Sequence, residues 1–299
     1  MDTREKTLIV IAGPTGVGKT ATAIELAEAL GAEIISADSR QVFREIPIGT
    51  AAPTAAEQAR VRHHFVGHKS ITEYYSAAEF EADVLRLLPA LFATSDYAVM
   101  CGGSMLYVDA VCKGIDLMPT ISPEVRDKVL RQYGECGIEC IIAQLELLDP
   151  DYLRIVDLKN EKRLLHALEI CLQAGVPYTS LRTGQVKPRP FRIVKYGLDM
   201  ERAQLFDRIN RRVDAMIEAG LVEEARSTYE LRHLNSLNTV GFKEMHAWMS
   251  GEMDFVTARE RIKKNTRVYA KRQLTWYRKD PTMTWLHPTC ALPAILGSL

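Results

Sequence analysis

The stretch that decides the fold is Leu8-Ile-Val-Ile-Ala-Gly-Pro-Thr-Gly-Val-Gly-Lys-Thr20. Its first five residues are apolar and predict a buried strand, and residues 21–30 read as a helix. Between them, Gly-x-x-x-x-Gly-Lys-Thr places backbone amides and a lysine around phosphate oxygens, with a hydroxyl suited to Mg²⁺. Strand, loop and helix in this order predict a phosphate-binding loop. We expect ligand contacts from Gly13, Pro14, Thr15, Gly16, Val17, Gly18, Lys19 and Thr20, with Thr20 as the metal ligand.

Composition indicates an ordinary globular protein. The 299 residues include 47% hydrophobic and 25% charged residues, and the 38 basic residues balance 38 acidic ones. A polar start and the lack of an apolar run of about 18 residues predict neither a signal peptide nor a membrane span. Six cysteines without a C-x-x-C pair are read as reduced thiols of a cytoplasmic protein. Residues 259–279 hold nine basic residues against Glu260 alone, so any contact with a polyanion is expected to be local.

Strand and helix patterns alternate in two parts of the chain. Short strands are predicted at residues 33–36, 97–101 and 191–200, and helices lie between or after them. This alternation predicts a parallel α/β sheet covered on both faces, with ligands at the carboxyl ends of its strands. Residues 122–182 show only helical patterns. We therefore expect a core domain of residues 1–117 and 185–299, with an all-helical insertion at 118–184.

Further elements follow from local signals. Ser76-x-x-Glu79 is a capping box that opens a helix through about Phe92. The other predicted elements are helices at 105–112, 123–133, 138–148, 150–156, 160–173, 201–219, from 221, from about 239 and at 254–279, a loop at 183–190, and a last strand at 283–286.

The residues that follow two of the predicted strands each allow a functional and a structural interpretation. Asp38 follows residues 33–36 and is either a base or metal-ordering carboxylate, or an aspartate that caps a turn. Residues 97–101 run into Cys101-Gly102-Gly103 and so lack the terminal carboxylate usual in a hydrolysing NTPase. The two glycines indicate either a ligand close to the backbone, or a tight turn in which Ser104 caps the next helix.

Basic side chains form two further patterns. Arg208, Arg211 and Arg212 are suited to clamping a diphosphate, although a solvated helix face is the ordinary alternative. The last long helix carries basic residues on one face with aromatic residues interleaved, a pattern that fits either nucleic acid or a solvated cationic face: Lys264, Arg267, Lys271 and Arg278, with Tyr269, Trp276 and Tyr277. His63, His64 and His68 lack partners for a metal site and are read as polar loop or packing residues.

Taken together, the motifs resemble the tRNA dimethylallyltransferases, also called tRNA isopentenyltransferases. The resemblance spans nearly the whole chain in order, and several blocks are more specific than the phosphate-binding loop. The matching blocks are 13–20, 36–42 (SADSRQV), 48–51 (IGTA), 75–78 (YSAA), 102–107 (GGSMLY), 123–126 (PEVR), 162–163 before 167–169, 208–213 (RINRRV), 240–243 (VGFK) and 266–278 (TRVYAKRQLTWYR).

This resemblance implies a P-loop-kinase-like core with a helical insertion. It also implies transfer of a dimethylallyl group from dimethylallyl diphosphate to N6 of adenosine 37, beside the tRNA anticodon, by a cytoplasmic, monomeric enzyme that uses Mg²⁺. Asp38 would be the general base, and Thr20 and Arg212 would hold the diphosphate. The implied tRNA-binding residues are Asp38, Ser39, Arg40, Gln41, Ser104, Arg126, Lys162, Arg163, Lys243, Lys271, Arg272, Gln273 and Arg278.

Two departures and three alternatives accompany this resemblance. Ser104 stands where the family commonly has threonine, and His166 replaces a frequent arginine, which weakens one expected phosphate contact. A prenyltransferase acting on free adenine nucleotides shares much of the core. A small-molecule kinase would need an Arg-rich lid, which the sequence lacks. A nucleic-acid-binding protein without catalytic function leaves the phosphate-binding loop and Asp38 unexplained.

Overall fold

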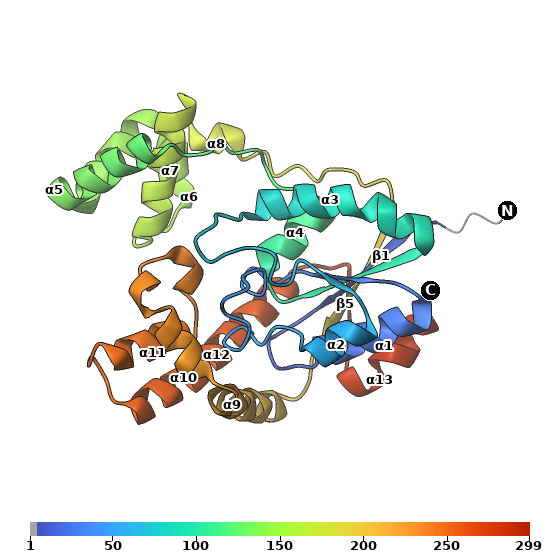
Figure 1. Ribbon diagram of the computed structural model, residues 1–299. Coiled ribbons are helices and arrows are strands. Elements are labelled where there is room, and N and C mark those ends of the chain that lie inside the picture. The colour runs from blue at the N-terminus through green and yellow to red at the C-terminus, as the bar shows by residue number, and fades with distance from the viewer. Residues whose placement is uncertain (1–4) are drawn as a thin grey trace. The chain divides into compact units, whose positions relative to one another are not determined.

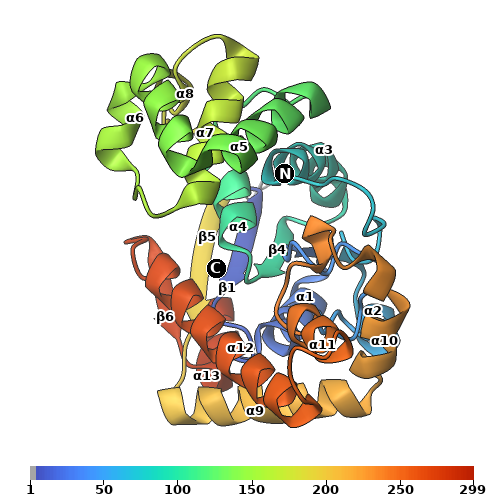
Figure 2. The ribbon, with the colours of Figure 1, turned by 90° about the vertical axis from the view of Figure 1, so that its left-hand side faces the viewer.

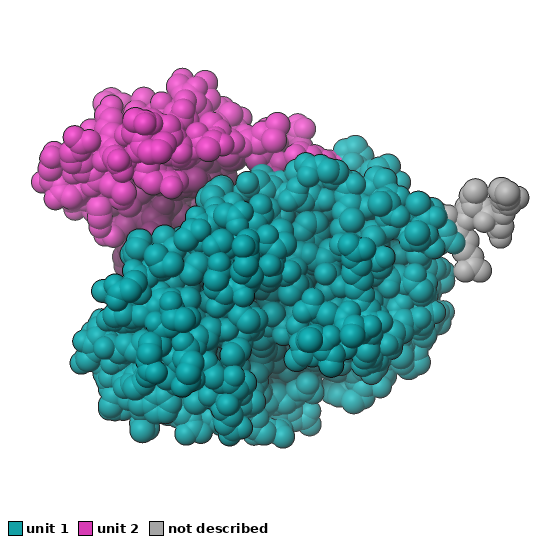
Figure 3. Space-filling model, in the orientation of Figure 1, with its two compact units in different colours: residues 1–112, 188–299 teal, residues 113–187 magenta. Residues whose placement is uncertain are grey.

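The chain forms two compact units. The computed structural model describes residues 5–299 (Figure 1). The core unit contains the chain up to Cys112 and again from Pro188, and the helical unit contains Lys113–Lys187 (Figure 3). The sequence predicted this insertion at residues 118–184, slightly shorter at both ends than the helical unit of the structure.

A parallel sheet forms the centre of the core unit, as the sequence predicted, and it has six strands where five were predicted. Its strand order is β3-β2-β4-β1-β5-β6, and every pair of neighbours is parallel. All strands therefore present their carboxyl ends at one edge, where ligands bind in such sheets. The strands are β1 (Thr7–Ala12), β2 (Ile34–Ser36), β3 (His63–His64), β4 (Tyr97–Gly102), β5 (Arg192–Leu198) and β6 (Met283–Leu286).

Alternate residues of β1 enter two different hydrophobic cores. Leu8 and Val10 pack with α3 (Ala77–Thr94) and α4 (Met105–Lys113), while Ile9 and Ile11 pack with α1 (Lys19–Leu30) and α13 (Pro288–Leu296). Successive side chains of a strand point to opposite faces of its sheet, so a continuous apolar run requires cover on both sides. All six residues of β1 are buried.

Most predicted elements are present, and several short ones were missed. The capping box at Ser76 is confirmed, because its hydroxyl accepts from the Glu79 amide at 3.2 Å and the Glu79 carboxylate accepts from the Ser76 amide at 2.7 Å. The structure adds α2 (Ala55–Arg60), α13 and β3. The loop interpretation of His63 and His64 was therefore wrong, because these residues form the edge strand β3.

The helical unit has its own core. It contains α5 (Pro123–Leu148), α6 (Pro150–Ile155), α7 (Glu161–Ala174) and α8 (Tyr178–Leu181), which bury a small apolar cluster. The sequence predicted two helices within α5, and Gly137 interrupts α5 with non-helical backbone angles (φ 76°, ψ −170°). Gly175 ends α7 in the left-handed region, as expected for a C-terminal glycine.

The second half of the core unit is helical apart from β5 and β6. Figure 2 shows α9 (Arg202–Glu218) beside α12 (Phe255–Tyr277), and the two helices are in contact. The predicted helix from about residue 239 begins at Phe242, because Gly241 caps it with a backbone amide bonded to Glu244. The remaining elements are α10 (Leu221–Ser227), η1 (Tyr229–Leu231), η2 (Asn235–Leu237) and α11 (Phe242–Met249). Over residues 5–299, no helix is long and apolar enough to cross a membrane.

Candidate active site

The loop after β1 presents unused backbone amides at the carboxyl edge of the sheet. Gly16 and Gly18 adopt positive φ angles of 82° and 109°, which glycine tolerates and other residues rarely adopt. Within residues 5–299, the amides of Gly18, Lys19 and Thr20 donate to no acceptor. These are the unpaired donors that open α1, and together with the positive end of the helix dipole they attract an anion.

Two half-buried cations face this loop. Burial lowers the pKa of Lys19 to about 8, and its Nζ donates to the Pro14 carbonyl at 2.8 Å. The guanidinium of Arg212, on α9, is largely buried, and burial lowers its pKa. The Arg212 guanidinium makes no hydrogen bond or ion pair with any residue from 5 to 299, and Lys19 makes no ion pair there. A cation shielded from water without an opposite charge is costly, so both side chains are suited to an anionic ligand.

Asp38 lies on the loop that follows β2, and one oxygen of its carboxylate is fixed. Oδ1 accepts hydrogen bonds from the amides of Arg40 at 2.9 Å and Gln41 at 3.4 Å. Oδ2 accepts none from the described part of the chain. The turn-capping reading and the catalytic reading of Asp38 are therefore compatible, because one oxygen orients the group and the other is available.

The glycines at the end of β4 are required by close contacts within the protein. A Cβ on Gly102 would lie 2.1 Å from the Ala37 carbonyl oxygen, and a Cβ on Gly103 would lie 2.3 Å from Nε2 of Gln273. Both glycines also line the cavity described below, so approach of a ligand to this backbone stays a prediction. Ser104 does not cap α4 through its side chain; its Oγ accepts from the Ser39 amide at 2.8 Å and donates to the Ser39 hydroxyl at 3.1 Å. Burial raises the pKa of the Cys101 thiol to about 11, which excludes it as a nucleophile at neutral pH.

Hydrogen bonds from two side chains outside it hold the loop of residues 46–52 in place. The carboxylate of Glu224, on α10, accepts from the amides of Ile48 at 2.8 Å and Gly49 at 2.6 Å. The Gln41 side chain donates to the carbonyl of Ala51 at 3.0 Å, where φ is +45°, and accepts from the Ser36 hydroxyl at 3.1 Å. Both ends of the Gln41 amide, which the family resemblance assigned to reading the adenine, are thus engaged within the protein.

A cavity of about 480 Å³ joins these elements. The predicted site residues that line it are Thr15, Lys19, Thr20, Asp38, Ser39, Arg40, Gln41, Ser104, Arg212, Lys243, Arg272 and Gln273. Arg40 is partly engaged, because its Nη1 donates to the carbonyls of Asn235 at 3.0 Å and Ser236 at 3.2 Å.

Sequence reasoning missed other residues of the cavity wall, including Tyr269, Asn238, Asn265 and His63. Tyr269 was noticed as one of the aromatic residues between basic ones, on a helix face that fits either nucleic acid or solvent. Instead it lines the cavity, where burial and the Asp38 charge raise its pKa to about 12. Its phenol therefore stays protonated and can donate or accept a hydrogen bond.

Several predicted site residues lie away from the cavity. On α9, Arg211 is exposed and paired with Asp207, and Arg208 is exposed with its Nη2 beside Gly18, so the predicted arginine clamp reduces to Arg212. On α12, Lys271 lies 5.5 Å from the ring centroid of Phe206 and Arg278 bonds Asp199 at 2.7 Å.

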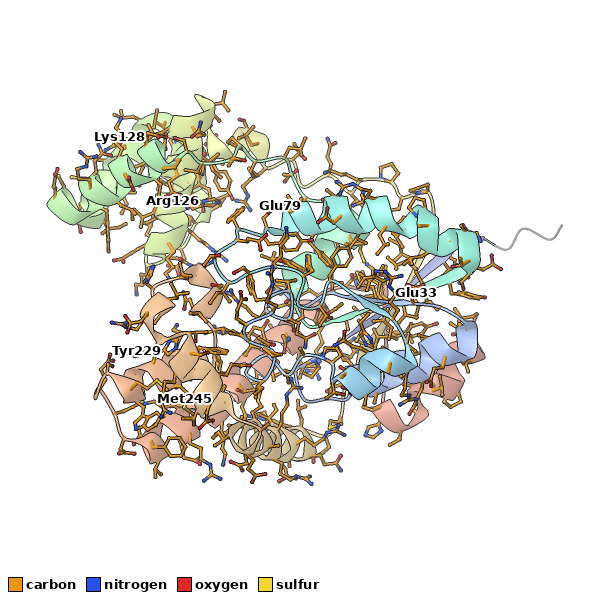
Figure 4. The ribbon with its side chains drawn as sticks, in the orientation of Figure 1. Glu33, Glu79, Arg126, Lys128, Tyr229 and Met245 are labelled. Carbon is orange, nitrogen blue, oxygen red and sulfur yellow. The ribbon has the colours of Figure 1, made fainter. Side chains whose placement is uncertain are left out.

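Three further predicted residues belong to the helical unit. Arg126, labelled on α5 in Figure 4, lies 3.6 Å from Glu169, whose other oxygen lies 3.5 Å from His166. Lys162 and Arg163 are exposed in the first turn of α7. None of the three lines the cavity.

The donor set of the cavity fits Mg²⁺ only in partnership with a phosphate ligand. Among residues 5–299, no three His, Cys, Asp or Glu side chains are grouped as a metal site. Mg²⁺ commonly keeps several waters and binds substrate phosphates with one or two protein oxygens. The Thr20 hydroxyl, in the first turn of α1 at the mouth of the loop, is suited to this role.

Comparisons with known proteins identify the family of this chain. The family model described as IPP transferase matches residues 41–280. The chain is 54% identical to tRNA dimethylallyltransferase 1 of Phocaeicola vulgatus over 282 residues, 94% of each chain, and 54% identical to tRNA dimethylallyltransferase 1 of Bacteroides thetaiotaomicron, covering 94% of this chain and 92% of the relative.

Solved structures give the same result. The tRNA isopentenylpyrophosphate transferase of Bacillus halodurans is 36% identical with a TM-score of 0.69, covering 95% of this chain and 90% of its own. A eukaryotic dimethylallyltransferase captured acting on tRNA is 26% identical with a TM-score of 0.80, covering 95% of this chain and 74% of its own. The chain therefore belongs to the IPP transferase family, among the tRNA dimethylallyltransferases.

Proposed function

We propose that this protein transfers the dimethylallyl group of dimethylallyl diphosphate to N6 of adenosine 37, next to the anticodon of tRNA. The products are N6-isopentenyladenosine and diphosphate. The observation that carries the proposal is the pairing of two features in one cavity. The first is a set of unpaired amides with two half-buried cations, Lys19 and Arg212, and the second is the free Oδ2 of Asp38.

The cationic half of the cavity suits the leaving group. As the C–O bond of the donor breaks, negative charge develops on the bridging oxygen of the diphosphate. Amides that are already oriented stabilise that charge without reorganising, and Lys19 and Arg212 add full charges in a buried setting. Because the reaction needs no water to attack a phosphate, the missing carboxylate after β4 agrees with this chemistry.

The carboxylate half of the cavity suits the acceptor. The exocyclic amine of adenine is a weak nucleophile, so it must lose a proton as the C–N bond forms. Asp38 takes that proton on Oδ2 while the amides of Arg40 and Gln41 hold Oδ1. The base must leave its stack to reach this group, which costs a few kcal/mol, and the phenol of Tyr269 and the side chain of Asn238 offer polar contacts to the extruded base.

Thr20 would hold Mg²⁺ together with the diphosphate, and the ion would supply further neutralisation of the leaving group's charge. The remaining chemistry belongs to the chain's own residues. We assign the exposed basic residues on α12 and in the helical unit to the RNA backbone, where they position the substrate: Lys271, Arg278, Arg126, Lys162 and Arg163.

The experiment that tests the proposal identifies the modified atom. Unmodified tRNA is incubated with the protein, Mg²⁺ and dimethylallyl diphosphate, then digested to nucleosides for mass spectrometry. We expect N6-isopentenyladenosine from a transcript with adenosine at position 37, and none from a matched transcript with guanosine there. Modification of the guanosine transcript, or of another base, would contradict the proposal.

A further inference from the structure

Gln273 connects the phosphate-binding loop to the end of β4. It lies on α12 and is only 2% exposed. Its Oε1 accepts a hydrogen bond from the Thr15 amide at 2.8 Å, and its Nε2 donates to the Gly103 carbonyl at 2.8 Å. A glutamine amide can accept and donate at the same time, so this one side chain satisfies two backbone groups that follow different strands.

The surrounding chain is shaped to this contact. A Cβ on Gly103 would lie 2.3 Å from Nε2 of Gln273, so only glycine leaves the amide room at that position. Ala270 and Tyr277 are buried on the same side of α12, at spacings that continue one helical face. Lys271 and Arg278 are exposed instead. The helix therefore turns Gln273 toward the loop and its basic side chains toward solvent.

The hydrogen bond to Thr15 determines which backbone amides of the loop are available to a phosphate. Thr15 lies inside the Gly-x-x-x-x-Gly-Lys-Thr pattern, in which Pro14 has no amide hydrogen and the Val17 amide donates to the Pro14 carbonyl at 3.4 Å. Because Oε1 occupies the Thr15 amide, this part of the loop is held in one orientation. The amides of Gly18, Lys19 and Thr20 remain for the ligand.

We propose that Gln273 is a positioning residue for the diphosphate of the donor and not a contact to RNA. The inference rests on the proposed function, since it names how one side of that site is held. It also connects the RNA-facing helix to the donor site, because Gln273 and Lys271 belong to the same turns of α12.

The test separates donor binding from RNA binding. Gln273→Met keeps the length of the side chain and removes both hydrogen bonds. We expect affinity for inorganic diphosphate with Mg²⁺, measured by calorimetry, to fall about tenfold or more, because a buried amide loses its partner. Affinity for tRNA without donor should stay at the parent value. Gln204→Met, which changes an exposed glutamine on α9, is the matched control and should change neither affinity.

A second variant keeps the glutamine and displaces it. Gly103→Ala should push Nε2 away and reproduce the loss of diphosphate affinity, so the proposal does not depend on the folding of one variant. Loss of tRNA affinity with diphosphate affinity intact would overturn the proposal, as would unchanged diphosphate affinity in both folded variants. A parent protein that binds diphosphate with this dependence on Gln273 but transfers no prenyl group would refute the proposed function and leave the positioning role standing.

Discussion

Replacing Gly102 by alanine should displace the Asp38 carboxylate and so slow catalysis, although Asp38 itself is unchanged. The added Cβ would stand 2.1 Å from the carbonyl oxygen of Ala37 and 2.4 Å from its carbonyl carbon. These are backbone atoms, so no flexible side chain can move aside. The Ala37 oxygen also accepts the Ser104 amide at 3.2 Å, and the Ala37 amide donates to the Cys101 carbonyl at 2.8 Å. Asp38 is the next residue, and the clash must move it.

The geometry sets the size of the effect. Relieving the contact requires a shift of about 1 Å, and a misplacement of that size costs about 100-fold in rate. Inserting a methyl group into this packed turn should also lower the free energy of unfolding by about 1–3 kcal/mol. Diphosphate binding should be kept, because Lys19 and the unpaired amides belong to the start of α1, which follows β1 and not β4.

Single-turnover prenyl transfer, calorimetric titration with diphosphate and chemical denaturation together measure these three quantities. Gly134→Ala is the matched control, since no atom lies within 4 Å of the added Cβ and the site is within α5. It should leave turnover unchanged and raise stability by up to about 1 kcal/mol, because alanine favours helix. If Gly102→Ala is destabilised but transfers at the parent rate, the placement of Asp38 does not control catalysis, and the reasoning fails.

Four more outcomes are expected. Asp38→Asn removes the base and keeps its shape, so single-turnover transfer should fall by about 10²–10⁴-fold with donor affinity preserved; retained transfer would exclude Asp38 as the base. Burial lowers the pKa of Lys19 to about 8, so Lys19 loses its proton as pH rises through that value, and affinity for a non-reactive donor analogue should weaken there; Lys19→Met should abolish this dependence, and a pH response surviving in the variant would point to another group. Lys271→Gln and Arg278→Gln should each weaken tRNA binding and reduce the slope of log affinity against log salt by about 1, whereas an unaltered slope would mark a solvated helix face. Glu224→Gln retains one acceptor where two amides donate, so the free energy of unfolding should drop by about 1–3 kcal/mol and the KM for the donor should rise; parent-like melting would show that the loop of residues 46–52 does not need this anchor.

The sheet and the helical insertion were predictable because their signals are local. The apolar run of residues 8–12 requires cover on both faces, and Ser76 with Glu79 begins a helix through bonds only three residues apart. Edge strand β3 escaped prediction because His63 and His64 have no apolar pattern. Their strand exists only because β2 pairs with it.

The site was predictable where a residue's own motif carries its role. Lys19, Thr20 and Asp38 follow strand ends, and the rule for parallel sheets brings those ends together. The roles of Gln273 and Glu224 depend instead on contacts across 258 and 175 residues of sequence, which no local pattern encodes. Gln273 was grouped with its basic neighbours for the same reason, although its helix turns it inward.

The most direct measurement of the central claim is a competition between acceptors. Labelled dimethylallyl diphosphate and Mg²⁺ are added to the protein with equal concentrations of unmodified tRNA and AMP, and the label in each acceptor is counted. If the protein is a tRNA prenyltransferase, the label enters tRNA and Asp38→Asn suppresses it. Label that accumulates in AMP while tRNA stays unlabelled would contradict the account.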